Sequence, residues 1–152
     1  STTGWCALLA GGAVATGSKR QHCISLSSTE SEIMAGSQAA CELVYFRELL
    51  GFIGLPQSEP TPLFIDNKSV VDLSHDYSAS HRSRHIKRRW FKIREFRFTG
   101  EIDTLGIATD NNPADIFTKP LSRVKFTKFR ATIMQLANPV SRTIAAFMGL
   151  LM

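Results

Sequence analysis

The 152-residue sequence has too few cysteines for a disulfide framework and lacks any long hydrophobic run. Its three cysteines, Cys6, Cys23 and Cys41, are odd in number and show no metal-site spacing, so we expect an intracellular, reducing compartment. No stretch reaches the roughly 18 to 20 apolar residues of a membrane-spanning helix, so no membrane span is expected. The chain has no signal peptide and begins with Ser1 rather than methionine, which predicts processing or excision from a longer protein.

The composition is that of a globular protein. Hydrophobic residues make up 43% and charged residues 20% of the chain, and neither repeats nor low-complexity tracts interrupt it. A chain of this length can bury one substantial core. We therefore expect one domain over residues 1–136, followed by an apolar C-terminal tail over residues 137–152.

Positive charge is concentrated in one segment. The net charge of the chain is +5, but residues 81–98 alone contain eight Lys or Arg and one Glu. Such a run is often only the solvated face of a helix, yet the near absence of acids favours a polyanionic partner. The residues expected to contact nucleic acid are Arg82, Arg84, His85, Lys87, Arg88, Arg89 and Lys92.

Hydrophobic periodicity and turn residues predict an α/β fold. We expect strands at 3–10, 62–66 and 102–108, with a hairpin partner in 13–26 that breaks at Gly17. Helices are expected at 29–50, 68–73, 81–98, 114–119 and 122–136. Gly51 and Gly100 are expected to end the first and third of these helices.

Glu32 lies at the start of the longest helical pattern. Thr29 and Glu32 have the spacing of a capping box, in which each side chain satisfies a backbone amide at the helix start. The other interpretation is that Glu32 extends from the helix start towards further carboxylates. Spacing alone leaves both interpretations open.

Two more acids lie at element boundaries. Asp66 ends an apolar strand just before Asn67, which can cap a short helix, so Asp66 is expected at a sheet edge beside a helix start. Asp115 lies in the first turn of a helix that begins at Pro113. Each has a structural explanation, because loop amides or a helix dipole stabilise an aspartate. Brought together, Glu32, Asp66 and Asp115 could hold two Mg²⁺ or Mn²⁺ ions, a device for phosphodiester hydrolysis.

Four ordered motifs carry a resemblance to a known family. They are LSSTESEIMA at 26–35, FIDNKS at 64–69, HRSRHIKRRW at 81–90 and NPADIFTKPL at 112–121, and STTGW at 1–5 also matches. Over about residues 1–136 the chain resembles the ribonuclease H domain of copia-type (Pseudoviridae) retrotransposon Pol polyproteins.

The resemblance implies a ribonuclease H-like mixed sheet flanked by helices. It implies divalent-metal hydrolysis of the RNA strand of an RNA–DNA hybrid, in a polyprotein that also contains a reverse transcriptase. Glu32, Asp66 and Asp115 match catalytic, metal-binding acids of the family, and His85 lies in its His-Ile segment.

The chain departs from the family at its start. The family has a further catalytic aspartate on a first strand that precedes the STTGW segment, and here no Asp occurs before Asp66. We therefore expect an N-terminally truncated fold with an exposed sheet edge. The alternative to an active enzyme is a co-opted, inactive remnant that serves as a structural or binding subunit, with a protein partner covering that edge and the apolar tail.

Overall fold

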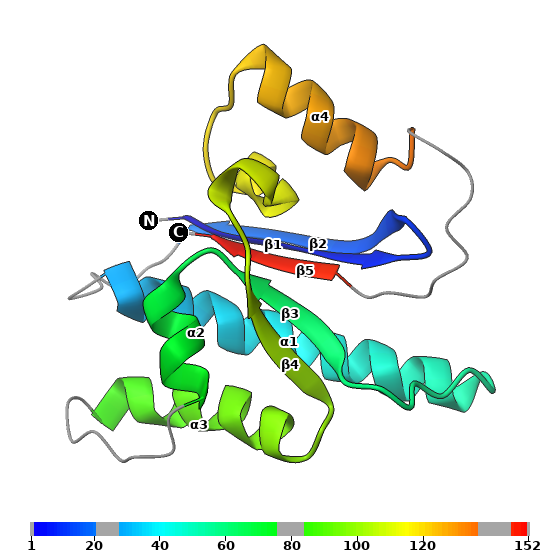
Figure 1. Ribbon diagram of the computed structural model, residues 1–152, viewed down its shortest axis with the longest axis vertical. Coiled ribbons are helices and arrows are strands. Elements are labelled where there is room, and N and C mark those ends of the chain that lie inside the picture. The colour runs from blue at the N-terminus through cyan, green and yellow to red at the C-terminus, as the bar shows by residue number, and fades with distance from the viewer. Residues whose placement is uncertain (1, 21–27, 76–83, 137–146, 152) are drawn as a thin grey trace.

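The computed structural model describes residues 2–20, 28–75, 84–136 and 147–151, and for 28–31, 84–90 and 147–151 it describes the backbone alone. Within these ranges the chain forms five strands, four α-helices and two 3₁₀ helices (Figure 1). In chain order they are β1 (Thr2–Leu9), β2 (Gly12–Arg20), α1 (Ser28–Phe52), β3 (Thr61–Ile65), α2 (Lys68–His75), α3 (Arg84–Phe98), β4 (Ile102–Gly106), η1 (Thr109–Asn111), η2 (Pro113–Phe117), α4 (Arg123–Ile133) and β5 (Phe147–Leu151).

The strands form one mixed sheet in the order β2-β1-β5-β3-β4. β1 pairs antiparallel with β2 and with β5, whereas β3 pairs parallel with β5 and with β4. Parallel neighbours need a crossover connection, and α2 and α3 supply it between β3 and β4. The mixed sheet with helices confirms the predicted α/β class.

The centre of the sheet is occupied by β5, the last element of the chain. Cys6 of β1 is paired with Gly149, and Phe64 of β3 is paired with Gly149 from the other side. This segment was expected to form a separate tail and to leave an open sheet edge. The expectation of an open edge was wrong, because β5 pairs with β1 there. The apolar character of 147–151 reflects a strand that has neighbours on both sides.

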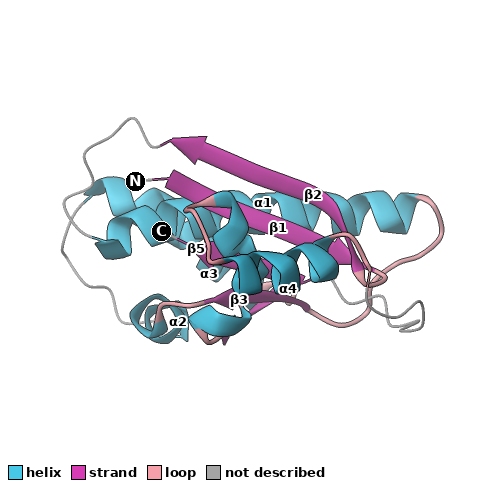
Figure 2. Ribbon diagram, turned by 90° about the horizontal axis from the view of Figure 1, so that it is seen from above, coloured by secondary structure: helices cyan, strands magenta, loops and turns pink. Residues whose placement is uncertain are grey.

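Both faces of β1 are buried because a different layer covers each one (Figure 2). Trp5 and Ala7 belong to the core that includes α1, whereas Cys6 packs with Ala114 and Phe117 of η2. Successive strand residues point to opposite faces. Helix α1 and the 3₁₀ helix η2 therefore lie on opposite faces of the sheet. A Cβ at Gly4 would collide with Thr118, so glycine permits the close approach of the chain at the end of η2 to β1.

Helix α1 supplies most of the helical side of the main core. Its small residues Ala35, Ala39 and Ala40 are buried against the sheet, and the buried Ile33, Leu43 and Val44 fill the space around them. Ile93 of α3 belongs to the same core. Among the described helices, none is both long enough and apolar enough to cross a membrane.

Three glycines show where local sequence signals succeed and fail. Gly100, at a φ of +76°, follows the end of α3 as expected. Gly51 was expected to end α1, but the helix continues to Phe52 and the left-handed residue is Gly54, at a φ of +84°. Gly17 was expected to interrupt the hairpin, yet β2 runs through it. A Cβ there would strike the indole of Trp5, so glycine fits the strand by leaving room for that ring.

The C-terminal helical segments also differ from expectation. The segment around Asp115 is the 3₁₀ helix η2 rather than an α-helix. A helix was expected over 122–136, and helix α4 begins after its cap, Ser122, and ends at Ile133. Val124 and Phe126 are exposed, whereas Phe129 is fully buried. The helix therefore touches the body along a narrow line.

Candidate metal centre

Asp66 lies at the junction of β3 and α2. The strand ends at Ile65, and Asn67 then caps the helix: its Oδ1 accepts hydrogen bonds from the backbone N–H groups of Ser69 at 2.9 Å and Val70 at 3.4 Å. This cap fixes the turn, so Asp66 is held at the carboxyl end of a central strand. In open α/β sheets this edge is where ligands usually bind.

Glu32 reaches the same junction from the first turns of α1. Its side chain is 3% exposed. The side chain of Asn67 hydrogen-bonds to it, whereas Oε2 has no hydrogen-bond partner. The Thr29 half of the expected capping box falls where only the backbone is described. The unpaired Oε2 nonetheless leaves Glu32 with binding capacity that a cap would not use.

Asp115 lies in η2 on the other face of the sheet and is fully buried. Asn112 caps this short helix by accepting the N–H of Ala114 at 3.1 Å, and Pro113 fits its first position. The backbone carbonyl of Asp115 accepts N–H groups of Thr118 at 3.1 Å and Lys119 at 3.3 Å. The backbone around Asp115 is thus fixed on both sides.

The three acids are coupled electrostatically in two pairs. Burial, and then the proximity of Asp66, raises the pKa of Glu32 from 4.5 to about 7, against the hydrogen bond from Asn67. Burial, and then the proximity of Asp115, raises the pKa of Asp66 from 3.8 to about 6. Asp66 is therefore the middle member of the three, because it interacts electrostatically with both Glu32 and Asp115.

The carboxylate oxygens at this edge are short of partners. Buried oxygens without a hydrogen-bond donor are Glu32 Oε2, Asp66 Oδ1 and both oxygens of Asp115. Asp115 Oδ1 does make an ion pair, since it lies 2.6 Å from Nζ of Lys119. Buried carboxylates are costly unless they are paired, hydrogen-bonded or bound to a metal ion.

The donor set fits a hard divalent cation, because Mg²⁺ and Mn²⁺ prefer carboxylate oxygens. Among the described residues, no three Asp, Glu, His or Cys side chains already stand in the arrangement of a formed metal site. The acids instead form two adjacent pairs, Glu32 with Asp66 and Asp66 with Asp115. A common ion would therefore require these side chains to turn their unpaired oxygens towards it.

The expected nucleic-acid contacts are only partly visible. Arg82 lies outside the described residues, and the side chains of Arg84, His85, Lys87, Arg88 and Arg89 lie where α3 is described by its backbone. Lys92 is described: its Nζ lies 3.3 Å from Glu95 Oε2 and 4.6 Å from the ring centre of Phe96. Figure 1 shows α1 and α3 beginning at the same end of the molecule. The basic N-terminal part of α3 therefore lies towards the end that holds the first turns of α1, where Glu32 is located.

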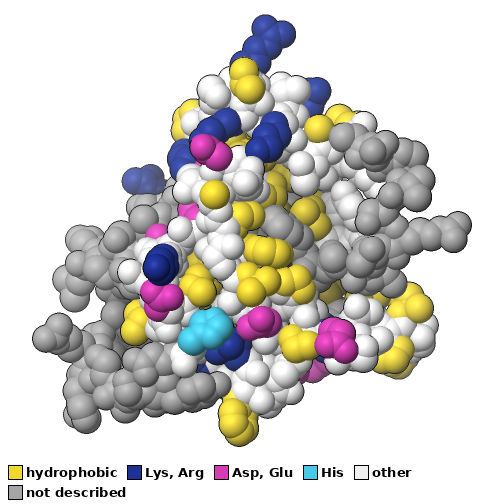
Figure 3. Space-filling model, in the orientation of Figure 1, with side chains coloured by type: hydrophobic (Ala, Val, Ile, Leu, Met, Phe, Trp, Pro, Cys, Tyr) yellow, Lys and Arg dark blue, Asp and Glu magenta, His cyan; other side chains and the backbone are white. Residues whose placement is uncertain are grey.

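A second basic surface was missed in the sequence analysis. Helix α4 contains Arg123, Lys125, Lys128 and Arg130 and no acid. Figure 3 shows Lys and Arg side chains gathered over this helix. Lys125 forms an ion pair with Asp110, and Lys128 Nζ donates to the Asp110 carbonyl at 2.8 Å. These two lysines therefore already have partners within the protein. The helix packs on η2, next to Asp115.

Two further residues of the site were also missed. Asn67 was interpreted only as a helix cap, and Lys119 only as part of a motif. The available signal was position: Asn67 adjoins Asp66, and Lys119 follows Asp115 by four residues. What the sequence did not show is that the amide reaches Glu32 and the ammonium reaches Asp115.

Comparison with known proteins identifies relatives by sequence. No family model and no solved structure matches the chain. It is 36% identical over 126 residues to the "Retrovirus-related Pol polyprotein from transposon TNT 1-94" of Nicotiana tabacum, covering 83% of this chain and 9% of that protein. It is 30% identical over 141 residues to the corresponding polyprotein from transposon RE2 of Arabidopsis thaliana, covering 93% of this chain and 10% of that protein. The chain is therefore related to one segment, about a tenth in length, of retrovirus-related Pol polyproteins from plant transposons.

Proposed function

We propose that this chain is the ribonuclease H-like domain of a retrotransposon Pol polyprotein and hydrolyses the RNA strand of RNA–DNA hybrids with Mg²⁺ or Mn²⁺. The observation that carries the proposal is the convergence of Glu32, Asp66 and Asp115. They come from α1, the β3–α2 junction and η2, and they leave four buried carboxylate oxygens without hydrogen bonds.

Each acid has a distinct place in the proposed site. Asp66 would be the central ligand of the set, because it lies between the other two acids and is half-buried rather than enclosed. Glu32 and Asp115 flank it, and Asn67 orients Glu32 by its hydrogen bond. Two Mg²⁺ ions bound here would activate the attacking water and stabilise the leaving oxygen of a phosphodiester.

The basic helices provide the second part of the proposal. A duplex lying on the acidic edge needs cations for its phosphates, and Arg123 and Arg130 of α4 are exposed. The basic N-terminal part of α3 would supply further cations for the phosphates of the duplex. Recognition of a hybrid then depends on groove shape, phosphates and the 2′-hydroxyls rather than on base sequence.

A second candidate function is an inactive binding subunit. It is favoured by β5, which occupies the centre of the sheet and whose sequence, FMGLL, contains no acid. Because Leu150 is paired with Ile65, the strand ends level with the Asp66 edge without adding a carboxylate. In this alternative the chain binds nucleic acid or a protein partner and does not cleave.

The two candidates are separated by one assay on the purified full chain. We expect Mg²⁺-dependent cleavage of a labelled RNA–DNA hybrid that is abolished by Asp66→Asn. Asp72→Asn, an exposed acid on the neighbouring helix α2, is the matched control and should cleave normally. Hybrid binding without cleavage supports the second candidate, and the absence of both binding and cleavage contradicts the proposed function.

A further inference from the structure

Lys119 places a positive charge directly on the proposed metal site. Its Nζ lies 2.6 Å from Oδ1 of Asp115. It also offsets part of the rise in the pKa of Asp66, so its charge acts on the middle acid as well. A single ammonium group therefore neutralises part of the same carboxylate set that is proposed to bind divalent cations.

The two partners of this ion pair differ sharply in exposure. The Asp115 side chain is 0% exposed, whereas the Lys119 side chain is 46% exposed. An exposed pair on a protein surface contributes little stability. Here one partner is a buried carboxylate whose oxygens have no hydrogen bond, so removing the ammonium would leave a buried charge without its directly paired cation, and only the more distant charge of Lys125 would act on it.

The local backbone keeps Lys119 beside Asp115 but leaves its side chain free to turn away. Its N–H bonds to the Asp115 carbonyl at 3.3 Å, which fixes where the side chain starts. Pro120 follows and restricts the backbone there. The long, half-exposed stem can reach Asp115 or solvent with little change elsewhere.

We propose that Lys119 is a tethered counter-cation that occupies the acidic site in the metal-free protein and is displaced when a divalent cation binds. The inference rests on the proposed function, because it concerns the same three acids. Its consequence is that Lys119 sets metal affinity: the ammonium stabilises the metal-free fold and competes with the ion for Asp115. This residue acts by positioning charge, not by contacting the reacting atoms.

The first test measures Mn²⁺ binding by the loss of the free-ion electron paramagnetic resonance signal at constant pH. Lys119→Met keeps the aliphatic stem and removes the charge. We expect it to bind Mn²⁺ about tenfold more tightly than the unsubstituted chain, the scale of removing one nearby unit charge from a half-exposed site. Lys128→Met, the same change on α4 where the lysine contacts Asp110 and Asn111, is expected to leave the affinity unchanged.

The same variants are tested for thermal unfolding. Without divalent cations, Lys119→Met is expected to unfold at a lower temperature than the unsubstituted chain. Added Mn²⁺ should then raise its midpoint more than it raises that of the unsubstituted chain. If Lys119 only stabilises the turn, Lys119→Met should lower the unfolding midpoint by an amount that added Mn²⁺ does not restore.

The second test needs no substitution and so does not depend on the variant folding. The rate of acetylation of each lysine in the unsubstituted chain is measured by mass spectrometry with and without Mn²⁺. Displacement predicts a several-fold faster reaction at Lys119 with Mn²⁺ and no change at Lys128.

Failure of this inference is distinguishable from failure of the proposed function. If the unsubstituted chain binds Mn²⁺ but Lys119→Met binds no more tightly and Lys119 acetylation does not change, the counter-cation is refuted while the metal site stands. If the unsubstituted chain binds no Mn²⁺ at all, the proposed function and this inference are both overturned.

Discussion

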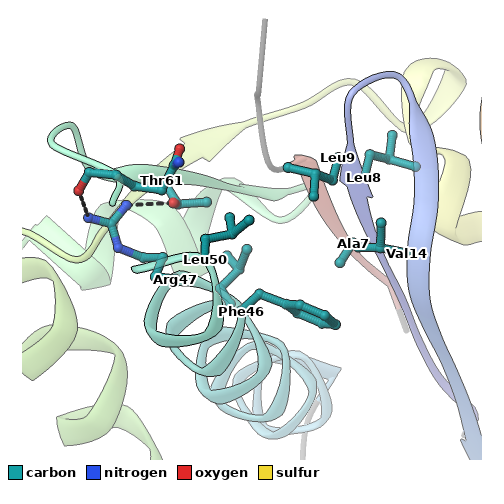
Figure 4. A pocket seen from close by; sticks show the side chains of 10 residues that line it. Ala7, Leu8, Leu9, Val14, Phe46, Arg47, Leu50 and Thr61 are labelled. Atoms are coloured by element: carbon teal, nitrogen blue, oxygen red, sulfur yellow. Dashed lines mark hydrogen bonds between the residues drawn. The ribbon is translucent and has the colours of Figure 1, made fainter. Parts of the chain in front are cut away.

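The two halves of α1 present charged groups to the sheet in contrasting ways. Towards the C-terminal end, the guanidinium group of Arg47 makes three hydrogen bonds: Nη1 donates to the Glu59 carbonyl and to Thr61 Oγ1, each at 2.7 Å, and Nη2 donates to the Gln57 carbonyl at 2.8 Å. Figure 4 shows the bond to Thr61. Towards the N-terminal end, Glu32 keeps an oxygen without a partner and lies beside another acid.

The surroundings differ in the same sense. The Arg47 end borders an apolar pocket between α1 and the hairpin, lined by residues such as Leu8, Val14 and Phe46. The guanidinium group of Arg47 holds the loop before β3 in place through its hydrogen bonds to Gln57 and Glu59. At the Glu32 end, negative charges lie near one another and repel, which lowers the stability of the metal-free protein. A satisfied charge thus has a structural role, and an unsatisfied cluster of like charges indicates ligand binding.

The largest expected effect separates activity from stability at the Glu32 end. Glu32→Gln should lower hybrid cleavage on the order of 10⁴-fold, as when one member of a catalytic set is removed. The metal-free free energy of unfolding at pH 8 should not fall, because a repulsive charge is lost. Glu48→Gln, exposed on the same helix, is the control for both measurements. A variant that keeps normal cleavage would remove Glu32 from the site.

The converse is expected at the Arg47 end. Arg47→Met should lower the free energy of unfolding by about 3 kcal/mol, because three hydrogen bonds to a charged group are lost. Mn²⁺ affinity of the folded variant should be unchanged. Urea denaturation and Mn²⁺ titration check the two statements. Equal stability of the variant would mean that Arg47 does not anchor the loop, and the contrast between the two ends would disappear.

The pH dependence of stability sharpens the comparison. The folded-state pKa values of Glu32 and Asp66, about 7 and about 6, lie above their ordinary values of 4.5 and 3.8. The folded state therefore binds more protons than the unfolded state in this range, and the free energy of unfolding falls as pH rises from about 4 to 7. The two shifts correspond to roughly 5 kcal/mol over this range, and because solvent screens part of the interaction we expect a loss of a few kcal/mol without metal.

The control for this prediction is the Glu32→Gln and Asp66→Asn double variant. Denaturant unfolding across the same pH range should show a flatter profile, since both raised groups have been removed. A profile as steep as that of the unsubstituted chain would place the pH dependence in other residues.

The smallest expected effect concerns α4. Replacing Arg123 and Arg130 by Gln should weaken hybrid binding several-fold and reduce the slope of log affinity against log salt concentration by about 2, one for each phosphate contact. Filter binding over a salt series measures both. An unchanged slope would show that these exposed arginines only face solvent.

Some of this arrangement was predictable from the sequence because its causes are local. Helical periodicity and a strand that runs into Asn67 are properties of short segments, and they correctly placed α1 and the turn at Asp66. Three of the four quoted motifs contain Glu32, Asp66 and Asp115 and so indicated which acids to group. Pairwise coupling through Asp66 is consistent with that grouping.

The remainder depends on contacts between distant segments. Gly17 is suited to a strand only because Trp5 lies across from it, and nothing near Gly17 in the sequence announces that ring. The central position of β5 depends on the unfilled space between β1 and β3, which a short apolar run does not reveal. The four-residue spacing of Asp115 and Lys119 could have suggested their ion pair, but the complete burial of Asp115 depends on the packing of η2 against β1 and α4.

The most direct test of the central claim, that the three acids bind divalent cations together, is Mn²⁺ binding by Asp66→Asn. Asp66 joins the two acid pairs, so its neutral isostere should reduce Mn²⁺ affinity more than tenfold, the scale of removing a charge in contact with the ion. Asp72→Asn should bind as the unsubstituted chain does. If Asp66→Asn binds Mn²⁺ with unchanged affinity and stoichiometry, the acids do not form a metal site and the account is wrong.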